Sequence, residues 1–391
     1  MDDNHYSDYC RNDRYSIDCK IGRGKMDISI VIATKGRVKL LTELLESIDV
    51  ARKNYSFQSE VILVDDSDET DQAFIKEACM TYDAKMVYFS PSVSGKRNYG
   101  AKMAKYDVIL FLDSDCIATP DLLEEHRKQY LNEQVGAVAG PLEFVGSENW
   151  FWKSVILTPY LICFQMPLWG ETSPWGTTAN FSVRKKVFEE VGGFDEGFPN
   201  KPGGEDVDLG LRIVESNYII RNTQKGLVYH NKETWSKVRG MFKRAWYYGA
   251  ADYYLIKKHP QYVADAVPRR NLINLCMMLV CVSLAIVRSP WYLIGIPEWL
   301  SLEILTMSVA MSKFGYKKSS VLHQIVTQLL ILSNELGFLR NCIVKRRPKY
   351  MFKQMVYFDN QLNGVMYNGN HYFWCFFINF FTWIITMIII V

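Results

Sequence analysis

Two carboxylates follow directly on an apolar run in this chain. Residues 108–112 are Val-Ile-Leu-Phe-Leu, and Asp113, Ser114 and Asp115 come next. A continuously apolar run is typical of a buried parallel strand, and ligands of open α/β sheets bind beyond the carboxyl ends of such strands. Neighbouring carboxylates repel each other, which a Mg²⁺ or Mn²⁺ ion bridging to phosphate would relieve. The same residues are also typical of a turn that caps the helix after Pro120, so both interpretations stay open here.

The surrounding pattern predicts an α/β fold with a mostly parallel sheet. Short apolar runs alternate with segments of helical spacing, which is typical of right-handed βαβ units. The predicted strands are 28–33, 61–64, 86–89 and 108–112, and helices lie between them. Parallel strands end on one edge of a sheet, so residues far apart in sequence can meet there. We therefore expect Thr34, Asp66, Arg97 and 113–115 to converge, which favours a site over a turn.

Motifs along the chain resemble glycosyltransferase family 2. The donor half is similar in residues 29–34, 64–67, 96–100 and 111–115, which read SIVIAT, VDDS, KRNYG and FLDSD. The acceptor half is similar in residues 180–185, 192–195, 204–206 and 228–230, which read NFSVRK, GGFD, GED and VYH. Together these cover roughly residues 27–250. The order of several separate motifs makes this resemblance much more specific than any one of them.

The resemblance implies the GT-A fold, a Rossmann-like α/β sandwich that binds nucleoside-diphosphate sugars and transfers the sugar with inversion. A Mg²⁺ or Mn²⁺ ion is implied because charge develops on the diphosphate leaving group. By analogy Asp115 would bind the metal, Asp113 would contact the ribose or a metal-bound water, and His230 would be a further ligand. The alternative for His230 is a structural residue at a strand end.

Other donor contacts are also implied by the resemblance. Arg97 would lie near the diphosphate, where its fork geometry suits phosphate oxygens, although it could instead be a surface arginine at a helix start. The full expected donor set is Thr34, Arg37, Asp66, Arg97, Asp113 and Ser114.

Inverting transfer needs a base for the acceptor hydroxyl. The resemblance assigns this role to Asp206, with Glu205 second, and a helix cap at Asp206 is a compatible alternative. Trp175 and Asn180 belong to a segment that would line the sugar and acceptor pocket, although Trp175 could only pack the domain.

Two departures from processive relatives favour addition of one sugar over polymer synthesis. Residues 242–246 read FKRAW, where processive members carry a Gln-x-x-Arg-Trp motif, and no series of long apolar spans suggests a polymer channel. The acceptor is expected to be a lipid-linked or envelope glycan. A sugar nucleotidyltransferase is the runner-up, but 34–37 are not a Gly-rich phosphate loop. A catalytically silent membrane scaffold is a third reading.

The C-terminal part is expected to be a helical membrane region. Apolar segments lie at about 272–287, 291–311 and 372–391, and a span needs about 20 apolar residues. The middle segment contains Glu298 and Glu303, which are costly in lipid, so the first two segments are expected to form a re-entrant, interfacial or spanning hairpin. The last segment is expected to span the membrane, and a buried helix is the alternative for it. The basic residues of 345–349 favour the cytoplasmic face. We expect a leader at 1–25, a catalytic domain at 26–265 on the cytoplasmic side, and a membrane-attached region at 266–391.

Composition excludes some partners. The chain has 45 basic and 42 acidic side chains and a net charge of +3, so no global field favours nucleic acid. Its nine cysteines form no Cys-x-x-Cys pair, which fits a reducing compartment and suggests no cysteine as a metal ligand.

Overall fold

The computed structural model describes residues 26–89, 91–198, 203–265, 269–313, 320–356 and 369–389. The leader expected at 1–25 lies outside these residues. The chain forms two compact units, each described by itself below. The first, here called the sheet unit, comprises the chain up to Val145, Cys163–Asn200 and Glu205–Asn231. The second, here called the helical unit, comprises Gly146–Ile162, Lys201–Gly204 and Lys232–Val391.

A seven-stranded sheet organises the sheet unit, and its strand order is β3-β2-β1-β4-β8-β6-β9. The strands are β1 Ile28–Thr34, β2 Ser59–Asp65, β3 Ala84–Tyr88, β4 Val108–Asp113, β6 Val135–Ala139, β8 Asn180–Arg184 and β9 Ile219–Asn222. Of these seven, β8 alone is antiparallel to its neighbours, β4 and β6. The prediction of a mostly parallel sheet is therefore confirmed.

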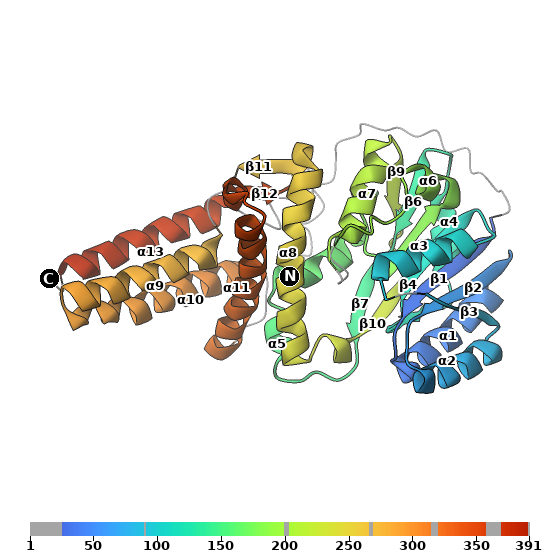
Figure 1. Ribbon diagram of the computed structural model, residues 1–391, viewed down its shortest axis with the longest axis horizontal. Helices are drawn as coiled ribbons and strands as arrows, with labels where there is room; N and C mark the ends of the chain where they lie inside the picture. Colours follow the sequence, from blue (N-terminus) through green and yellow to red (C-terminus); the bar gives the residue numbers. More distant parts are fainter. Residues whose placement is uncertain are drawn as a thin grey trace, which may run out of the picture. The chain divides into compact units, whose positions relative to one another are not determined.

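Helices cover both faces of this sheet, as βαβ connectivity requires. They are α1 Val38–Lys53, α2 Glu69–Thr81, α3 Val93–Met103, α4 Leu122–Gln129, α6 Lys185–Glu190 and α7 Glu205–Glu215. In Figure 1, α1 and α2 lie on one face and α3 on the other. The α3 face has a continuous apolar core to which β4 contributes Phe111, α6 contributes Phe188 and α7 contributes Leu209. A strand covered on both sides must be apolar throughout, which explains the run before Asp113.

A small second sheet joins segments that are remote in sequence. Its strands are β5 Cys116–Ala118, β10 Val228–Asn231 and β7 Leu142–Val145, in the order β5-β10-β7. β10 is antiparallel to β5, with His230 opposite Cys116. This pairing brings the segment after β4 beside a strand that comes more than 100 residues later.

Close packing positions α3 on the sheet. Ser92 caps the helix, since its Oγ accepts from the backbone N–H of Gly95 at 3.0 Å. A Cβ at Gly100 would lie 2.4 Å from Val31 Cγ1 of β1, closer than any real contact. Glycine at this position therefore lets α3 approach the sheet, which sets the place of Arg97 one turn earlier.

In the helical unit, α8 Val238–Lys258 crosses α11 Val321–Val344 at very short range. A Cβ on Gly249 would meet the backbone of Asn334, and one on Gly337 would meet the backbone of Trp246. The Asn341 side chain also donates to the Ala250 carbonyl at 2.9 Å. The sheet unit accordingly ends at Asn231, whereas the sequence suggests a boundary near 265, because α8 packs with a distant helix.

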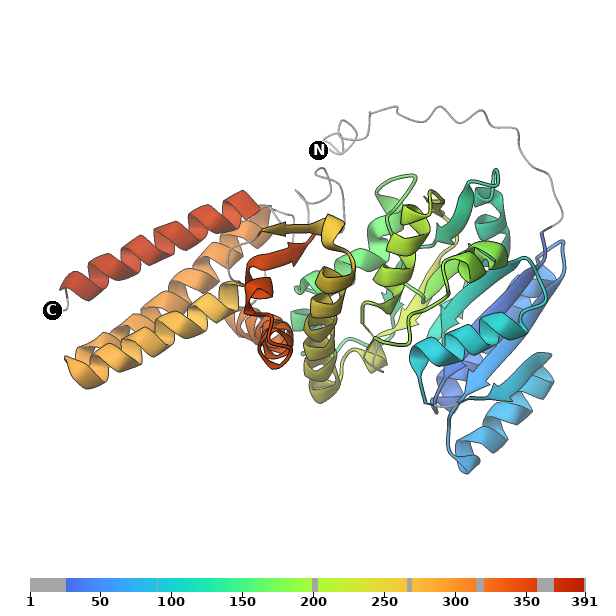
Figure 2. The same ribbon diagram turned by 45° about the horizontal axis from the view of Figure 1, so that its top comes forward.

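The three apolar segments near the C-terminus form a group of helices. They are α9 Arg270–Val287, α10 Gly295–Lys313 and α13 Gly369–Ile389, which lie side by side in Figures 1 and 2. Glu303 is buried among them and accepts from Asn274 at 3.3 Å and from Asn379 at 2.9 Å. The carboxylate that looked costly in lipid is thus hydrogen-bonded inside the group.

Within the described ranges, no helix is both long enough and apolar enough to cross a bilayer. The spans expected at 272–287, 291–311 and 372–391 are therefore not confirmed.

Candidate active site

The site lies at the carboxyl edge of the parallel strands. β1 is flanked by β2 and β4, with Thr34 opposite Asp65 and Ala33 opposite Asp113. The residues that follow these strands are consequently neighbours in space, as predicted for Asp66 and 113–115. Thr34 and Ser114 are buried at this edge.

Arg97 joins two carboxylates from distant parts of the chain. Its Nη2 donates to Asp113 Oδ1 at 3.0 Å, and its Nη1 donates to Glu205 Oε1 at 2.9 Å. The Arg97 side chain is only 7 % exposed. Burial disfavours its charge, but Asp113 and Glu205 more than offset this, and the pKa of Arg97 is raised. The surface-arginine alternative is therefore wrong.

The loop before α7 is braced in a way that supports Arg97. The Asn98 side chain donates to the Phe194 carbonyl and accepts from its N–H, at 2.9 and 2.8 Å. Arg212 donates to the carbonyls of Val191 and Gly193 while pairing with the buried carboxylate of Asp208. The Phe194 ring lies 5.5 Å from the guanidinium carbon of Arg97.

Glu205 and Asp206 begin α7 and differ in their surroundings. Glu205 is buried on Arg97, whereas Asp206 is half-buried and its Oδ1 accepts from the N–H of Val207 at 2.9 Å. Burial, with the Glu205 charge second, raises the pKa of Asp206 to about 7, although Arg97 opposes the shift. A carboxyl group that titrates near neutral pH suits a general base. The hydrogen bond also fits the capping alternative, which is compatible with a base role.

Asp115, Cys116 and His230 form the cluster in the described part of the chain that could hold a metal ion. One ligand atom from each lies within 4.8 Å of the others, and all three residues are buried. His230 Nε2 is 3.6 Å from Asp115 Oδ1, and the His230 ring packs against Phe144 at 5.2 Å between centroids. The Asp115 oxygen and the His230 nitrogen fit a divalent cation such as Mn²⁺, whereas the Cys116 sulfur is a soft ligand that suits Zn²⁺ better.

This geometry differs from two expectations. Cys116 was not expected among the candidate ligands, and the pairing of β5 with β10 brings it beside His230, which leaves no local signal in the sequence. Asp113 was expected near the metal, but its carboxylate pairs with Arg97 because α3 places that guanidinium beside the end of β4.

Three further ion pairs lie at this edge. Arg37 Nη1 lies 2.9 Å from Asp115 Oδ2. The two oxygens of Asp66 pair with different lysines, Lys96 through Oδ1 and Lys35 through Oδ2. Neither lysine was singled out from sequence, although both belong to the motifs that carry Arg37 and Arg97.

Trp175 and Asn180 are both buried in the sheet unit. Asn180 is fully buried, donates to the carbonyls of Pro141 and Gly226, and holds His126 Nε2 at 2.8 Å from its Oδ1. Its side-chain oxygen and nitrogen both form hydrogen bonds inside the core, which corrects its assignment to a sugar pocket. Trp175 is 6 % exposed and packs where a Cβ on Gly210 of α7 would be. This arrangement matches the packing alternative for Trp175.

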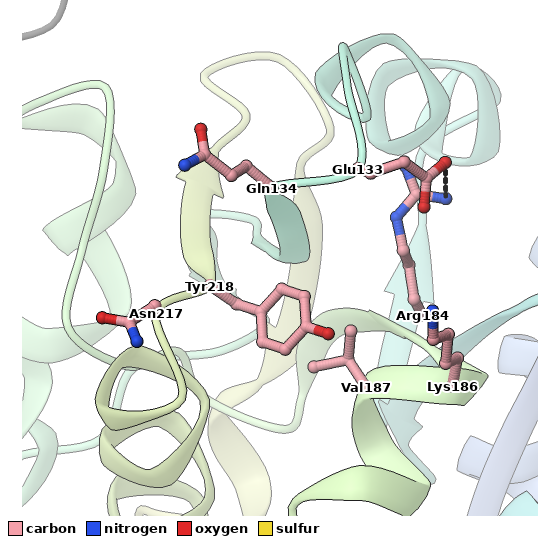
Figure 3. A pocket seen from close by; sticks show the side chains of 7 residues that line it. All are labelled: Glu133, Gln134, Arg184, Lys186, Val187, Asn217 and Tyr218. Atoms are coloured by element: carbon pink, nitrogen blue, oxygen red, sulfur yellow. Dashed lines mark ion pairs between the residues drawn. The ribbon is translucent and has the colours of Figure 1, made fainter.

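A cavity of about 220 Å³ lies elsewhere on the sheet unit. Figure 3 shows its lining residues, among them Tyr218, Val187 and Arg184, which pairs with Glu133 at 3.9 Å. Gln134 and Tyr218 precede β6 and β9, so the cavity is at the amino ends of these strands. It is therefore at the sheet edge opposite the charged site.

Comparisons with known proteins agree with this geometry. Residues 29–192 match the family model described as Glycosyl transferase family 2. O-antigen biosynthesis protein RfbC of Myxococcus xanthus is 30 % identical over 236 residues, which cover 53 % of this chain and 18 % of that protein. Pre-mycofactocin glycosyltransferase of Mycobacterium tuberculosis (strain H37Rv) is 28 % identical over 256 residues, 63 % of this chain and 51 % of that protein. The chain thus spans no more than about half the length of these relatives.

A solved structure is similar over a larger share of the chain. Mannosyltransferase PcManGT from Pyrobaculum calidifontis, in complex with GDP-Man and Mn²⁺, aligns with a TM-score of 0.50 and 14 % identity. The alignment covers 83 % of this chain and 89 % of that one. At this identity the likeness shows a shared fold.

Proposed function

Because this chain contains a glycosyl transferase family 2 domain with the α/β GT-A fold, we propose that it transfers one sugar from a nucleoside-diphosphate sugar to an acceptor hydroxyl, with inversion. One observation carries the proposal. The bridge from Arg97 to both Asp113 and Glu205 joins the donor end of β4 to the acidic start of α7. One edge of the sheet thus holds both the charges that bind a diphosphate and the carboxyl group that accepts a proton.

In the proposed reaction, the acceptor oxygen forms a bond to the anomeric carbon as the bond from that carbon to the diphosphate oxygen breaks. The acceptor proton passes to Asp206, and the nucleoside diphosphate leaves with the bonding electron pair. A pKa near 7 leaves part of Asp206 ionised at neutral pH, and it makes that carboxylate a stronger base than an ordinary one.

Asp115 and His230 would hold the divalent cation, Mg²⁺ or Mn²⁺, with Cys116 beside them. When bound, that ion supplies positive charge to the leaving diphosphate. The buried Arg97 guanidinium pairs with both Asp113 and Glu205, and it orients the two carboxylates.

We propose attachment to the cytoplasmic side of a cell membrane, with a lipid-linked or envelope glycan as acceptor. Large apolar side chains exposed on the α9, α10 and α13 group support this, including Ile286 at 81 %, Leu305 at 60 % and Ile388 at 69 % exposure. Exposed patches of this kind are typical of membrane or protein contact. Exposed basic residues at 345–349, just after α11, suit an anionic cytoplasmic surface.

A donor screen tests the enzymatic proposal. Full-length protein with Mn²⁺ or Mg²⁺ would be titrated with UDP-, GDP- and dTDP-sugars, while binding and release of nucleoside diphosphate are both measured. Asp206→Asn should keep nucleotide binding and lose transfer by roughly 10²- to 10⁴-fold. Glu189→Gln, which removes an exposed carboxylate from α6, is the matched control and should behave as wild type. Loss of binding and transfer together in Asp206→Asn would remove the assignment of the base.

The same screen separates the other readings. A sugar nucleotidyltransferase would release pyrophosphate from a nucleoside triphosphate, and a silent scaffold would bind no donor with any metal. Flotation with vesicles of phosphatidylglycerol and phosphatidylethanolamine tests the membrane. Protein that stays at the bottom of the gradient would contradict membrane attachment, but it would not bear on the proposed sugar transfer.

A further inference from the structure

Arg37 and Asp115 form an ion pair on the carboxylate that the proposed function assigns to the metal. We propose that Arg37 is a displaceable counter-ion: it pairs with the Asp115 carboxylate until a divalent cation binds there, and it then pairs with the diphosphate of the donor. This inference rests on the proposed function. It makes Arg37 a positioning residue that couples metal binding to donor binding.

The loop that carries Arg37 is held in an unusual conformation. Gly36 and Arg37 both have left-handed backbones, with φ of 62° and 60°. L residues rarely adopt this conformation, and where they do the surrounding structure imposes it. Here the Gly36 N–H donates to Ser67 Oγ at 2.7 Å, and Ser67 in turn donates to Asp65 Oδ1 at 2.5 Å. The end of β2 thereby orients the loop after β1.

The strained turn directs Arg37 across β1 toward the segment that follows β4. Arg37 directly precedes α1, which begins at Val38, and its backbone carbonyl accepts from Leu41 N–H at 3.0 Å. The backbone is therefore fixed while the side chain extends to Asp115. A rigid base with a long side chain lets the guanidinium change partners without moving the loop.

Burial shows which partner of the pair can move. The Asp115 side chain is 4 % exposed and that of Arg37 is 44 % exposed. Arg97, by contrast, is 7 % exposed and bound to two carboxylates, so its displacement would break two ion pairs. Arg37 can swing into solvent or toward a ligand, whereas Asp115 needs a cation wherever Arg37 goes, because a buried carboxylate without a counter-charge is costly.

The exchange leaves both Asp115 and Arg37 with partners of opposite charge. A divalent cation on Asp115 replaces the one positive charge of Arg37, and the released guanidinium suits the oxygens of a diphosphate, which it can contact in a bidentate manner. Asp115 Oδ1 lies 3.6 Å from His230 Nε2 and Oδ2 lies 2.9 Å from Arg37 Nη1, so Arg37 and the cation compete for the charge of one carboxylate. Donor and cation should therefore bind with positive coupling, and Arg37 should be the source of part of it.

The test measures Mn²⁺ affinity of the full chain by electron paramagnetic resonance, with and without UDP or GDP and with no acceptor. Arg37→Gln should bind Mn²⁺ roughly three- to tenfold more tightly than wild type without nucleotide, because a competing ion pair is gone. The factor by which nucleotide tightens Mn²⁺ binding should fall in this variant. Arg37→Lys, which keeps the charge, should stay within about twofold of wild type.

A matched control and a reference variant make the result decisive. Lys39→Gln removes a positive charge two residues away whose side chain is 88 % exposed and pairs with Glu43, so it should leave Mn²⁺ affinity unchanged. Equal or weaker Mn²⁺ binding by Arg37→Gln, or the same gain in Lys39→Gln, would overturn the competition. Asp115→Asn separates a failure of this inference from a failure of the metal site. If it does not weaken Mn²⁺ binding, both are overturned, whereas a failure of the Arg37 variants alone overturns only the competition.

Discussion

The guanidinium of Arg97 donates to Glu205 Oε1 at 2.9 Å across 108 residues of sequence, and it is the contact that joins the two halves of the site. The same guanidinium binds Asp113 at 3.0 Å. Since the contact is buried, its strength depends on both partners being present. A buried pair that loses one member leaves a charge without compensation, which costs about 3–5 kcal/mol.

Arg97→Gln should therefore destabilise the protein by about 3 kcal/mol or more and abolish transfer. The fall would be measured by urea unfolding and by nucleoside-diphosphate release. The double variant Arg97→Gln/Glu205→Gln should recover part of the stability, because it removes the uncompensated carboxylate as well. A double variant no more stable than Arg97→Gln would contradict a direct pairing.

Transfer should depend on pH through Asp206. The base must be ionised, and burial beside Glu205 raises its pKa to about 7, so the rate should rise between pH 6 and pH 8. Glu205→Gln removes the charge that raises this pKa, so the rising limb should move to lower pH. The measurement is the pH profile of kcat/KM under donor saturation. A profile that stays in place in Glu205→Gln would argue against Asp206 as the titrating group.

Stability should fall with acid because of His126 in the core. Burial lowers the pKa of His126 from 6.5 to about 4, while its ring nitrogens lie 2.9 and 2.8 Å from Ser182 Oγ and Asn180 Oδ1. The folded state therefore binds fewer protons than the unfolded state. The stabilisation is complete above pH 6.5 and is lost as the pH falls toward 4, by up to about 3 kcal/mol.

Chemical unfolding at a series of pH values from 7.5 to 4 would measure this loss. His126→Gln keeps hydrogen-bonding groups but cannot titrate, so its stability should vary less with pH in this window. An unchanged slope in this variant would assign the acid sensitivity to other groups.

Gly100→Ala should disturb both the fold and the site. The new Cβ would lie 2.4 Å from Val31 Cγ1, so α3 must shift and carry Arg97 with it. Overpacking of this kind costs about 1–3 kcal/mol. Gly240→Ala in α8 is the control, since its Cβ would be 3.7 Å from the nearest atom and alanine favours helices. Thermal unfolding should separate the two variants, and equal midpoints would contradict the close approach of α3.

The strand edge and most of the charged site could be predicted because their signals are local. Apolar runs at 28–33, 61–64 and 108–112 are continuous in sequence, and parallel strands place their carboxyl ends together whatever the loops between them do. Asp115, Asp206 and Arg97 follow from that rule and from motif order. Helices α9, α10 and α13 were also visible as apolar segments, because helical length needs no distant partner.

Tertiary structure alone decided which way individual side chains turn. Asn180 lies in a recognisable motif, yet the pairing of β8 between β4 and β6 commits its amide to the core. Cys116 joins Asp115 and His230 because β5 pairs with β10, and the crossing of α8 with α11 assigns 238–258 to the second unit. These outcomes depend on contacts between residues that are remote in sequence, from Ala139 and Phe181 to Cys116 and His230. No local pattern records such contacts, since the register of distant strands and helices is set by the packing of the whole core.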